Sequence, residues 1–216
     1  MRRDDNLNNH RSLNTEFKMY LPFIFLIAAF FTAPAATQWT EVKTLDETIV
    51  LDLKYATKDN FVKEKLYDCP RCFLRPEVAK AVVAAHKELK KKGYGGLKLF
   101  DCYRPRPIQR KLWKILPDDR YVANPDKGSM HNRGSAVDLT IVDKKGKALD
   151  MGTEFDYFGP EGYHSYTKLP KNVLANRKLL REVLAKHGLY HIKTEWWHYS
   201  YRAKQYELSD WVWGCD

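Results

Sequence analysis

The sequence predicts an α+β fold for residues 36–216. Short segments in which apolar and polar residues alternate, as in strands, share the chain with three runs of helical periodicity. These strand and helix segments do not alternate regularly, as they would in a doubly wound parallel sheet. The chain shows no internal repeat and no low-complexity tract, and 216 residues suit one domain preceded by a targeting segment.

The first half of this domain holds two predicted strands and one predicted helix. Alternation predicts a strand over 47–55, and mixed polarity predicts a loop over 58–75. A helix begins at Pro76, which suits a first helical turn, and continues through the run EVAKAVVAAHKELK until Gly93 stops it. A short strand over 97–102 follows a pair of glycines that predicts a turn.

The second half holds two predicted helices and two strand segments. The rigid sequence YRPRP precedes a helix over 108–116, and polar, glycine-containing residues predict a loop over 124–133. A strand follows over 135–142. The third helix covers 171–186 and has a glycine as its stop, and an aromatic, strand-like segment covers 189–201.

The strand over 135–142 separates its side chains into two sets. Val137, Leu139 and Ile141 share one face, whereas Asp138 points to the other. An aspartate that points away from the apolar face is expected to line a site.

The composition is basic, with a formal net charge of +10. Such a balance can attract nucleic acid, a membrane surface or an acidic polymer. Most lysines and arginines are spread along the chain, and the one cluster, over 87–92, lies at the end of a predicted helix, where cations complement the helix dipole. No nucleic-acid-binding signature accompanies it, so we expect no nucleic-acid partner.

Residues 1–35 have the order of a signal peptide. Basic residues precede an apolar run over 20–31, and an A-x-A motif at Ala33 and Ala35 follows it. This run is short for a membrane span, which needs ~20 residues. We therefore expect a periplasmic or secreted protein cleaved near Ala35, with membrane attachment only if the leader stays uncleaved. Met19 is an alternative start.

Four cysteines remain in the predicted mature part: Cys69, Cys72, Cys102 and Cys215. An even number in an oxidising compartment suggests disulfide bonds, and four cysteines allow three pairings. The C-x-x-C at 69–72 can be a local disulfide, a redox pair or half of a zinc site, and no second C-x-x-C completes such a site. We favour Cys69–Cys72 with Cys102–Cys215, which would tie the C-terminal tail beside the segment after strand 97–102.

Two histidines and an aspartate form a candidate metal site. Two histidines and one carboxylate can occupy three corners of a Zn²⁺ tetrahedron and leave the fourth open. His131, Asp138 and His198 are the candidate ligands, and the turn at Gly134 lets the first two converge. Glu195 is the candidate general base, since a carboxylate that is not a ligand can take a proton from water.

The spacing of Glu195 and His198 conflicts with a regular strand. Residues three apart on a strand point to opposite faces. If both side chains serve one site, the chain must contain a bulge, a bend or a short helical turn there.

These motifs resemble those of a known family. The patterns S-x-H-x-x-G-x-A-x-D over 129–138 and E-x-x-H over 195–198 are similar to those of zinc D,D-peptidases related to the hedgehog signalling domain. The closer resemblance is to D-alanyl-D-alanine dipeptidases of the VanX type. DCYRP over 101–105, MGTEFD over 151–156 and EWWHY over 195–199 match that branch as well. The resemblance covers about residues 45–201 and implies a small, mostly antiparallel sheet flanked by helices, with the zinc site on the sheet face.

The resemblance also implies catalytic roles. His131, Asp138 and His198 would hold one Zn²⁺ per chain. Glu195 would deprotonate the attacking water and later protonate the leaving amine. Arg104 would stabilise the oxyanion, a task that suits a side chain with a permanent charge and a forked donor set.

Four further residues belong to the implied substrate site. Asp156 would face the free ammonium of a dipeptide, and Ser129 would donate a hydrogen bond to the substrate. Asp101 would act by orienting Arg104, and Trp197 would form a wall of the pocket, although core packing suits a tryptophan equally well.

The function implied is an exported, zinc-dependent dipeptidase that hydrolyses D-alanyl-D-alanine in cell-wall peptide metabolism. Two alternatives stay open: a D,D-carboxypeptidase that trims peptidoglycan stem peptides with the same zinc site, and a zinc-stabilised binding module without turnover. The presence of Glu195 and Arg104 argues against the binding module. The leader and Cys102 depart from the family's cytoplasmic members, and export favours scavenging of wall fragments over removal of a cytoplasmic precursor.

Overall fold

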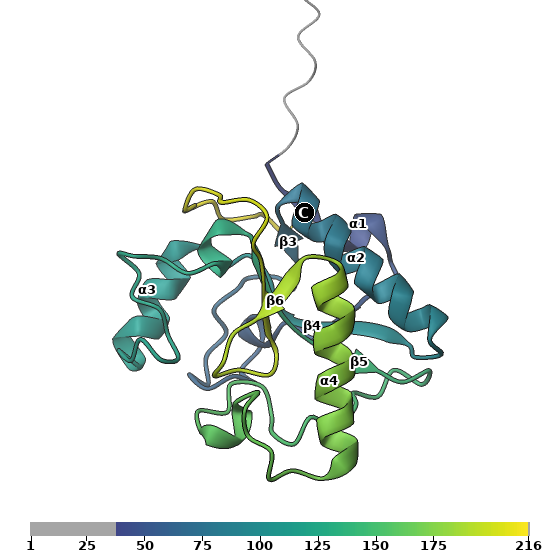
Figure 1. The fold of residues 1–216 in the computed structure, drawn as a ribbon. Coiled ribbons are helices and arrows are strands. Elements are labelled where there is room, and N and C mark those ends of the chain that lie inside the picture. The colour runs from purple at the N-terminus through teal and green to yellow at the C-terminus, as the bar shows by residue number, and fades with distance from the viewer. Residues whose placement is uncertain (1–37, 216) are drawn as a thin grey trace, which may run out of the picture. The chain divides into compact units, whose positions relative to one another are not determined.

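A five-stranded sheet forms the centre of the described part of the protein, which a computed structural model gives for residues 38–215 (Figure 1). The predicted leader lies outside these residues. The strand order is β2-β4-β5-β7-β6. Only β2 and β4 are parallel, and the other neighbours pair antiparallel, as the family resemblance implied. The bounds are β2 Val50–Leu51, β4 Gly96–Asp101, β5 Ala136–Val142, β6 Leu189–His191 and β7 His198–Tyr201.

A second, two-stranded sheet joins the N-terminal end of the described chain to the segment before the first long helix. It pairs β1 (Thr40–Glu41) with β3 (Phe73–Leu74), and the short helix α1 (Val42–Leu45) follows β1. Three single-turn 3₁₀ helices also lie in residues 38–215: η1 Lys54–Ala56, η2 His131–Arg133 and η3 Pro160–Gly162.

Two long helices, α2 (Pro76–Lys91) and α4 (Lys171–Lys186), pack against the sheet and against each other. Their buried residues join Val137, Leu139 and Ile141 of β5 in one apolar core. Both helices end where the sequence predicted, because a glycine with positive φ follows each of them. No helix within residues 38–215 has the length and apolar character that a membrane crossing requires.

The helix α3 (Arg106–Ile115) stands apart from α2 and α4 (Figure 1). It begins two residues before the predicted start, since Pro107 fits its first turn. Only Gln109 and Leu112 of this helix are buried. The burial of a glutamine in so exposed a helix indicates that its amide has a polar partner inside.

Two predicted strand segments are shorter than the sequence indicated. In 47–55 only Val50–Leu51 pairs, and the chain then turns into η1, where the buried Asn60 amide donates to the carbonyls of Lys54 and Thr57. The segment 189–201 forms a hairpin, in which β6 and β7 are joined by residues 192–197. The predicted loop over 58–75 contains β3.

The predicted cysteine pairing is wrong. The structure brings Cys72 together with Cys102 and Cys69 together with Cys215, with Cα–Cα distances of 5.4 and 5.6 Å. The reason is non-local. Residues beyond β4 run beside β3, where the Tyr103 N–H donates to the Phe73 carbonyl at 2.9 Å, and this places Cys102 beside the residue that precedes β3.

Candidate metal centre and active site

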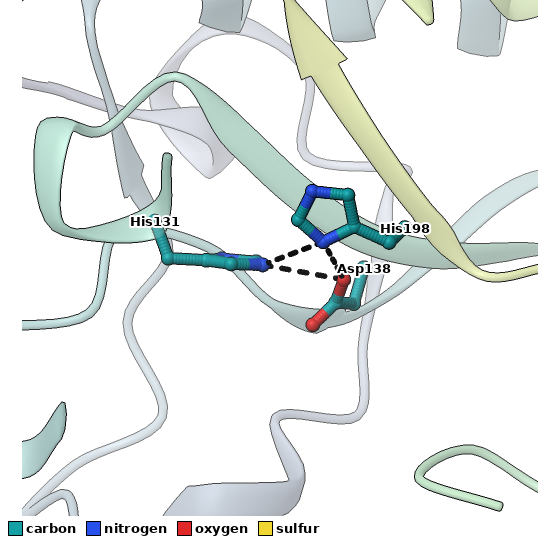
Figure 2. A group of neighbouring side chains, drawn as sticks. All are labelled: His131, Asp138 and His198. Carbon is teal, nitrogen blue, oxygen red and sulfur yellow. Dashed lines mark hydrogen bonds and ion pairs between the residues drawn. The ribbon is translucent and has the colours of Figure 1, made fainter. Parts of the chain in front are cut away.

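The three predicted ligands converge on one point of the sheet (Figure 2). Asp138 of β5 and His198 of β7 lie directly opposite each other across two paired strands, and His131 approaches from η2. His131 Nε2 lies 3.1 Å from His198 Nδ1 and 3.3 Å from Asp138 Oδ1, and His198 Nδ1 lies 3.1 Å from the same oxygen. All three side chains are buried. They are the one group of metal-ligand type found in residues 38–215.

The turn between His131 and Asp138 depends on a glycine. Gly134 has a φ of +68° and ends η2, a conformation that residues with a side chain rarely adopt. A Cβ at this position would lie 2.3 Å from the Trp39 ring. Gly134 therefore lets the chain reverse tightly enough for η2 to bring His131 over the strand that carries Asp138.

The outer ring nitrogen of each histidine has a hydrogen-bond partner, which determines where the ring carries its proton. His131 Nδ1 lies 2.7 Å from the Cys102 carbonyl oxygen, which can only accept, so this nitrogen carries a proton and Nε2 presents a lone pair. His198 Nε2 lies 2.9 Å from Ser200 Oγ, which is a partner for its proton. Such outer hydrogen bonds are typical of metal-binding histidines.

These donors fit a metal ion. Three lone-pair atoms packed at 3.1–3.3 Å repel one another unless a cation lies between them. An ion with tetrahedral bonds of about 2.0–2.1 Å separates its ligand atoms by roughly 3.3 Å. Burial alone would raise the pKa of Asp138, but His131 and His198 hold that pKa well below its usual range, so the site keeps an anionic ligand.

Glu195 lies next to the metal group without belonging to it. Its Oε2 is 3.8 Å from His198 Nδ1, and the side chain is 11% exposed. It precedes β7 in a bent segment, so the parity of a strand does not apply and the predicted bend is confirmed. Burial, followed by the charges of Asp138 and Asp156, raises the Glu195 pKa well above its usual value. A carboxyl with a raised pKa can exchange a proton near neutral pH.

Arg104 is held from three sides. Its Nε and Nη2 donate to Asp101 Oδ2 at 2.9 and 2.7 Å, and its Nη1 donates to Gln109 Oε1 at 3.0 Å. Nη2 also lies 3.9 Å from Asp138 Oδ2. Burial would lower the pKa of Arg104, but Asp101 raises it well above the usual value, so the guanidinium stays charged. The buried cation is fixed beside the metal group.

A cavity of about 460 Å³ opens over this centre. The three candidate ligands line it together with five other residues that the sequence singled out, namely Arg104, Ser129, Asp156, Glu195 and Trp197. Asp101 does not line the cavity, because it is fully buried behind Arg104. Trp196 lines a different cavity and donates its Nε1–H to Thr153 Oγ1 at 2.8 Å, so Trp197 is the member of the pair that faces the site.

Asp156 forms a carboxylate wall of the cavity. Its φ of +58° is uncommon for a residue other than glycine. The Tyr55 hydroxyl donates to its Oδ2 at 2.9 Å. Burial, and then the charge of Asp138, raises the Asp156 pKa to about 8. Because burial and Asp138 disfavour the ionised form, a cationic partner in the cavity would stabilise the Asp156 carboxylate.

Ser129 lies in the loop before η2 and lines the cavity. Its hydroxyl lies 3.2 Å from Asn132 Oδ1, which also accepts from the Ser129 N–H at 2.8 Å. The Asn132 amide in turn donates to the Arg104 carbonyl at 2.7 Å. The serine is therefore fixed to the same backbone that carries the arginine.

Comparison with known proteins identifies the family of the chain. A family model described as D-ala-D-ala dipeptidase, of the peptidase M15 group, matches residues 35–210. The chain belongs to this family. It is 34% identical over 175 residues to a D-alanyl-D-alanine dipeptidase of Escherichia coli K12, over 80% of this chain and 89% of the relative. A D-alanyl-D-alanine dipeptidase of Enterococcus faecium is 31% identical over 179 residues, over 73% and 88%. The solved vancomycin-resistance D,D-dipeptidase VanXYg aligns with a TM-score of 0.40 at 16% identity, over 69% of this chain and 56% of that one.

Sequence reasoning missed the residues that support the site in this family member. Tyr55 donates to Asp156, Tyr67 donates to Asp101 Oδ1 at 2.7 Å, and Gln109 accepts from Arg104. They lie outside the motifs that carry the resemblance, and no local pattern marks them. Ser200 is different, because it lies two residues after His198 and strand parity alone places both on one face.

Proposed function

We propose that this protein is a zinc-dependent dipeptidase that hydrolyses D-alanyl-D-alanine. The observation that supports it most is a single cavity in which three convergent ligand atoms, the carboxyl of Glu195, the cation of Arg104 and the carboxylate of Asp156 all meet. Relatives that are named D-alanyl-D-alanine dipeptidases and align over most of their own length support the same substrate.

Zinc suits the donor set. Two imidazoles and one carboxylate are a common catalytic zinc ligand set, and three protein ligands leave one position open. The residues that would hold the ion are His131, Asp138 and His198. When bound, zinc supplies Lewis acidity, which acidifies water and polarises a carbonyl group.

Glu195 and Arg104 supply the proton transfer and the charge stabilisation. Glu195 takes a proton from the attacking water and returns it to the amine that leaves when the peptide bond breaks, for which its raised pKa suits it. Arg104 offers a permanent cation to the oxyanion that forms on the attacked carbonyl. Asp101 and Gln109 hold the guanidinium in place beforehand, so little reorganisation accompanies the reaction.

Asp156 would make the enzyme a dipeptidase. The free ammonium of a dipeptide pairs with its carboxylate, whereas an acylated amine would leave the carboxylate without a partner. The uncommon backbone conformation of Asp156 and its bond from Tyr55 support a functional placement, since such conformations concentrate at binding sites.

We also propose export. Residues 1–35 would direct the chain to the periplasm or beyond, and residues 36–216 would form the peptidase domain. Two cysteine pairs at disulfide distance support an oxidising compartment. Outside the cytoplasm the enzyme would recover D-alanine from wall fragments, and a small D,D-dipeptide would be its substrate.

Amine release by the purified mature protein tests the proposal. D-Ala-D-Ala, L-Ala-L-Ala and N-acetyl-D-Ala-D-Ala are compared with added Zn²⁺ and with a chelator. The expected result is zinc-dependent cleavage of D-Ala-D-Ala alone. Cleavage of the acetylated compound would assign the protein to the D,D-carboxypeptidases, and zinc binding without cleavage of any compound would favour a binding module.

A further inference from the structure

The backbone just beyond β4 forms the outer layer of the metal centre. The Cys102 carbonyl oxygen accepts from His131 Nδ1 at 2.7 Å and thereby leaves Nε2 unprotonated toward the metal position. One residue earlier, Asp101 holds Arg104, and two residues later the Arg104 N–H donates to the His131 carbonyl at 3.1 Å. Four consecutive residues thus place both a metal ligand and the oxyanion-stabilising cation.

The ladder between β4 and β5 shifts register between Leu99 and Asp101, and the pairing of β4 ends at Asp101. The segment that supports the site therefore begins where the chain leaves the sheet. Beyond that point the Tyr103 N–H donates to the Phe73 carbonyl. A carbonyl outside a sheet has more freedom to move than one inside it. The Tyr103 N–H belongs to the same peptide unit as the Cys102 carbonyl, so outside the sheet the hydrogen bond to Phe73 is the backbone contact that holds this unit against β3.

The Cys72–Cys102 pair lies at that point. Both side chains are buried, at 0% and 2% exposure. Cys72 is itself fixed, because its carbonyl accepts from the Val42 N–H at 2.9 Å beside the β1–β3 ribbon. A bond between the two sulfur atoms adds a covalent tie to the hydrogen bond from Tyr103 and so anchors the segment after β4 to this ribbon.

We propose that the Cys72–Cys102 bond is a positioning element of the metal centre. It fixes the Cys102 carbonyl, which orients His131 and so sets the affinity for the metal. The role assigned to this bond rests on the proposed zinc function. The cysteines touch neither substrate nor metal, and they act through the backbone.

The second pair provides a matched control. Cys69–Cys215 joins residues 146 apart in the sequence, compared with 30 for Cys72–Cys102. Neither of its residues lines the cavity, and the sulfur contact described for Cys69 is with the Gly214 carbonyl at the surface. In the chain-entropy view, a longer closed loop stabilises a fold more than a short one. A loss of metal that arises only from general destabilisation would therefore affect the control at least as strongly.

The test compares the Zn²⁺ dissociation constants of the full mature chain, C72A/C102A and C69A/C215A by competition with a chromophoric chelator. Alanine leaves no buried polar group at either position. Loss of an outer hydrogen-bond partner of a metal ligand weakens metal binding about 10- to 100-fold. Because C72A/C102A keeps the backbone carbonyl and only displaces it, we expect a loss at the lower end of that range, about tenfold, and unchanged affinity for C69A/C215A. The spectrum of the Co²⁺-substituted proteins should change only in C72A/C102A, because only there does His131 move.

Equal affinities in all three proteins would overturn the positioning role, and so would equal losses in both variants. Free thiols at Cys72 and Cys102 in the native protein would overturn it as well. If the wild-type chain binds no zinc, the proposed function itself fails, so the two failures are distinguishable. If C72A/C102A does not fold, the same constant is measured on the wild-type chain before and after reduction by a phosphine, and an unchanged constant would then contradict the proposal.

Discussion

The protein contains two pairs of buried or half-buried histidines that look alike and differ in chemistry. His131 and His198 have ring centroids 4.9 Å apart with planes at 69°, and His164 and His191 have centroids 4.4 Å apart with planes at 65°. The pairs lie on opposite faces of β7, since Tyr199 stands opposite His191 in the β6–β7 ladder and points away from His198.

The neighbours of each pair make the difference. The first pair has the carboxylate of Asp138 and an outer partner for each ring. For His164, neither ring nitrogen has a hydrogen-bond partner among residues 38–215, and burial, then His191 and Arg181, lowers its pKa to about 3. Two close imidazoles are therefore not a metal site by themselves. A third, anionic ligand and oriented rings are also needed.

The largest predicted effect is a difference in activity between alanine variants of the first histidine pair and those of the second. H131A and H198A each remove one of three proposed ligands, so hydrolysis of D-Ala-D-Ala should fall to background. H164A and H191A leave the ligand set intact and should keep wild-type kcat/KM. The measurement is steady-state kinetics at saturating zinc. Full activity in H131A would show that His131 is not a ligand and would contradict the distinction between the two pairs.

The next effect concerns the base beside the first pair. E195Q keeps the size of the side chain but removes its capacity to accept a proton, so kcat should fall roughly 10²- to 10⁴-fold. Zinc content, measured by atomic emission on the same sample, should stay at the wild-type level. If the variant loses its metal, Glu195 is a ligand and the assigned division of roles is wrong.

A smaller effect is expected at the amino-end wall. D156N removes the charge that pairs with the substrate ammonium, and a hydrogen bond to a charged group is worth about 1.5–3 kcal/mol, so KM should rise roughly 10- to 100-fold. D150N, in the same segment but outside the cavity, is the matched control and should leave KM unchanged. An unchanged KM in D156N would remove Asp156 from the substrate site.

The smallest effect is a pH dependence of stability from the second pair. The His164 pKa is about 3 in the fold and about 6.5 in the unfolded chain. Above pH 6.5 both states are neutral and the group contributes nothing. As the pH falls from 6.5 toward 3, only the unfolded state binds a proton, so stability declines by up to about 1.4 kcal/mol per pH unit.

Urea unfolding at pH 7.5 and pH 4.5 measures this decline. The difference in unfolding free energy between the two pH values should be smaller in H164L than in the wild-type chain, since the variant lacks the group that titrates. Equal differences in the two proteins would show that His164 is free to ionise in the fold.

Local signals were sufficient for the long helices and for the three side chains that converge as candidate ligands. The bounds of α4 agree with the prediction because periodicity and a glycine stop lie within the segment itself. The three ligands follow from short motifs in which a turn, a strand and a small residue keep fixed spacings. Glu195 was assigned to the same motif, and the bend that its spacing required is present.

Non-local packing determined what the sequence did not predict. The cysteine pairing depends on β3 lying beside the end of β4, which no spacing encodes. Gln109 sits in an exposed helix, yet its amide is buried against Arg104. The strand predicted over 47–55 gives way to η1, whose end is held by the side-chain amide of Asn60 from further along the chain. Side chains that act across elements leave no local pattern.

Diffraction data collected at the zinc absorption edge, from a crystal grown with Zn²⁺, would show directly whether His131, Asp138 and His198 bind zinc. We predict one anomalous peak within residues 38–215, bonded to His131 Nε2, Asp138 Oδ1 and His198 Nδ1 at about 2.0–2.2 Å. A peak between His164 and His191, or a zinc ion bound to the opposite nitrogen of His131, would contradict it.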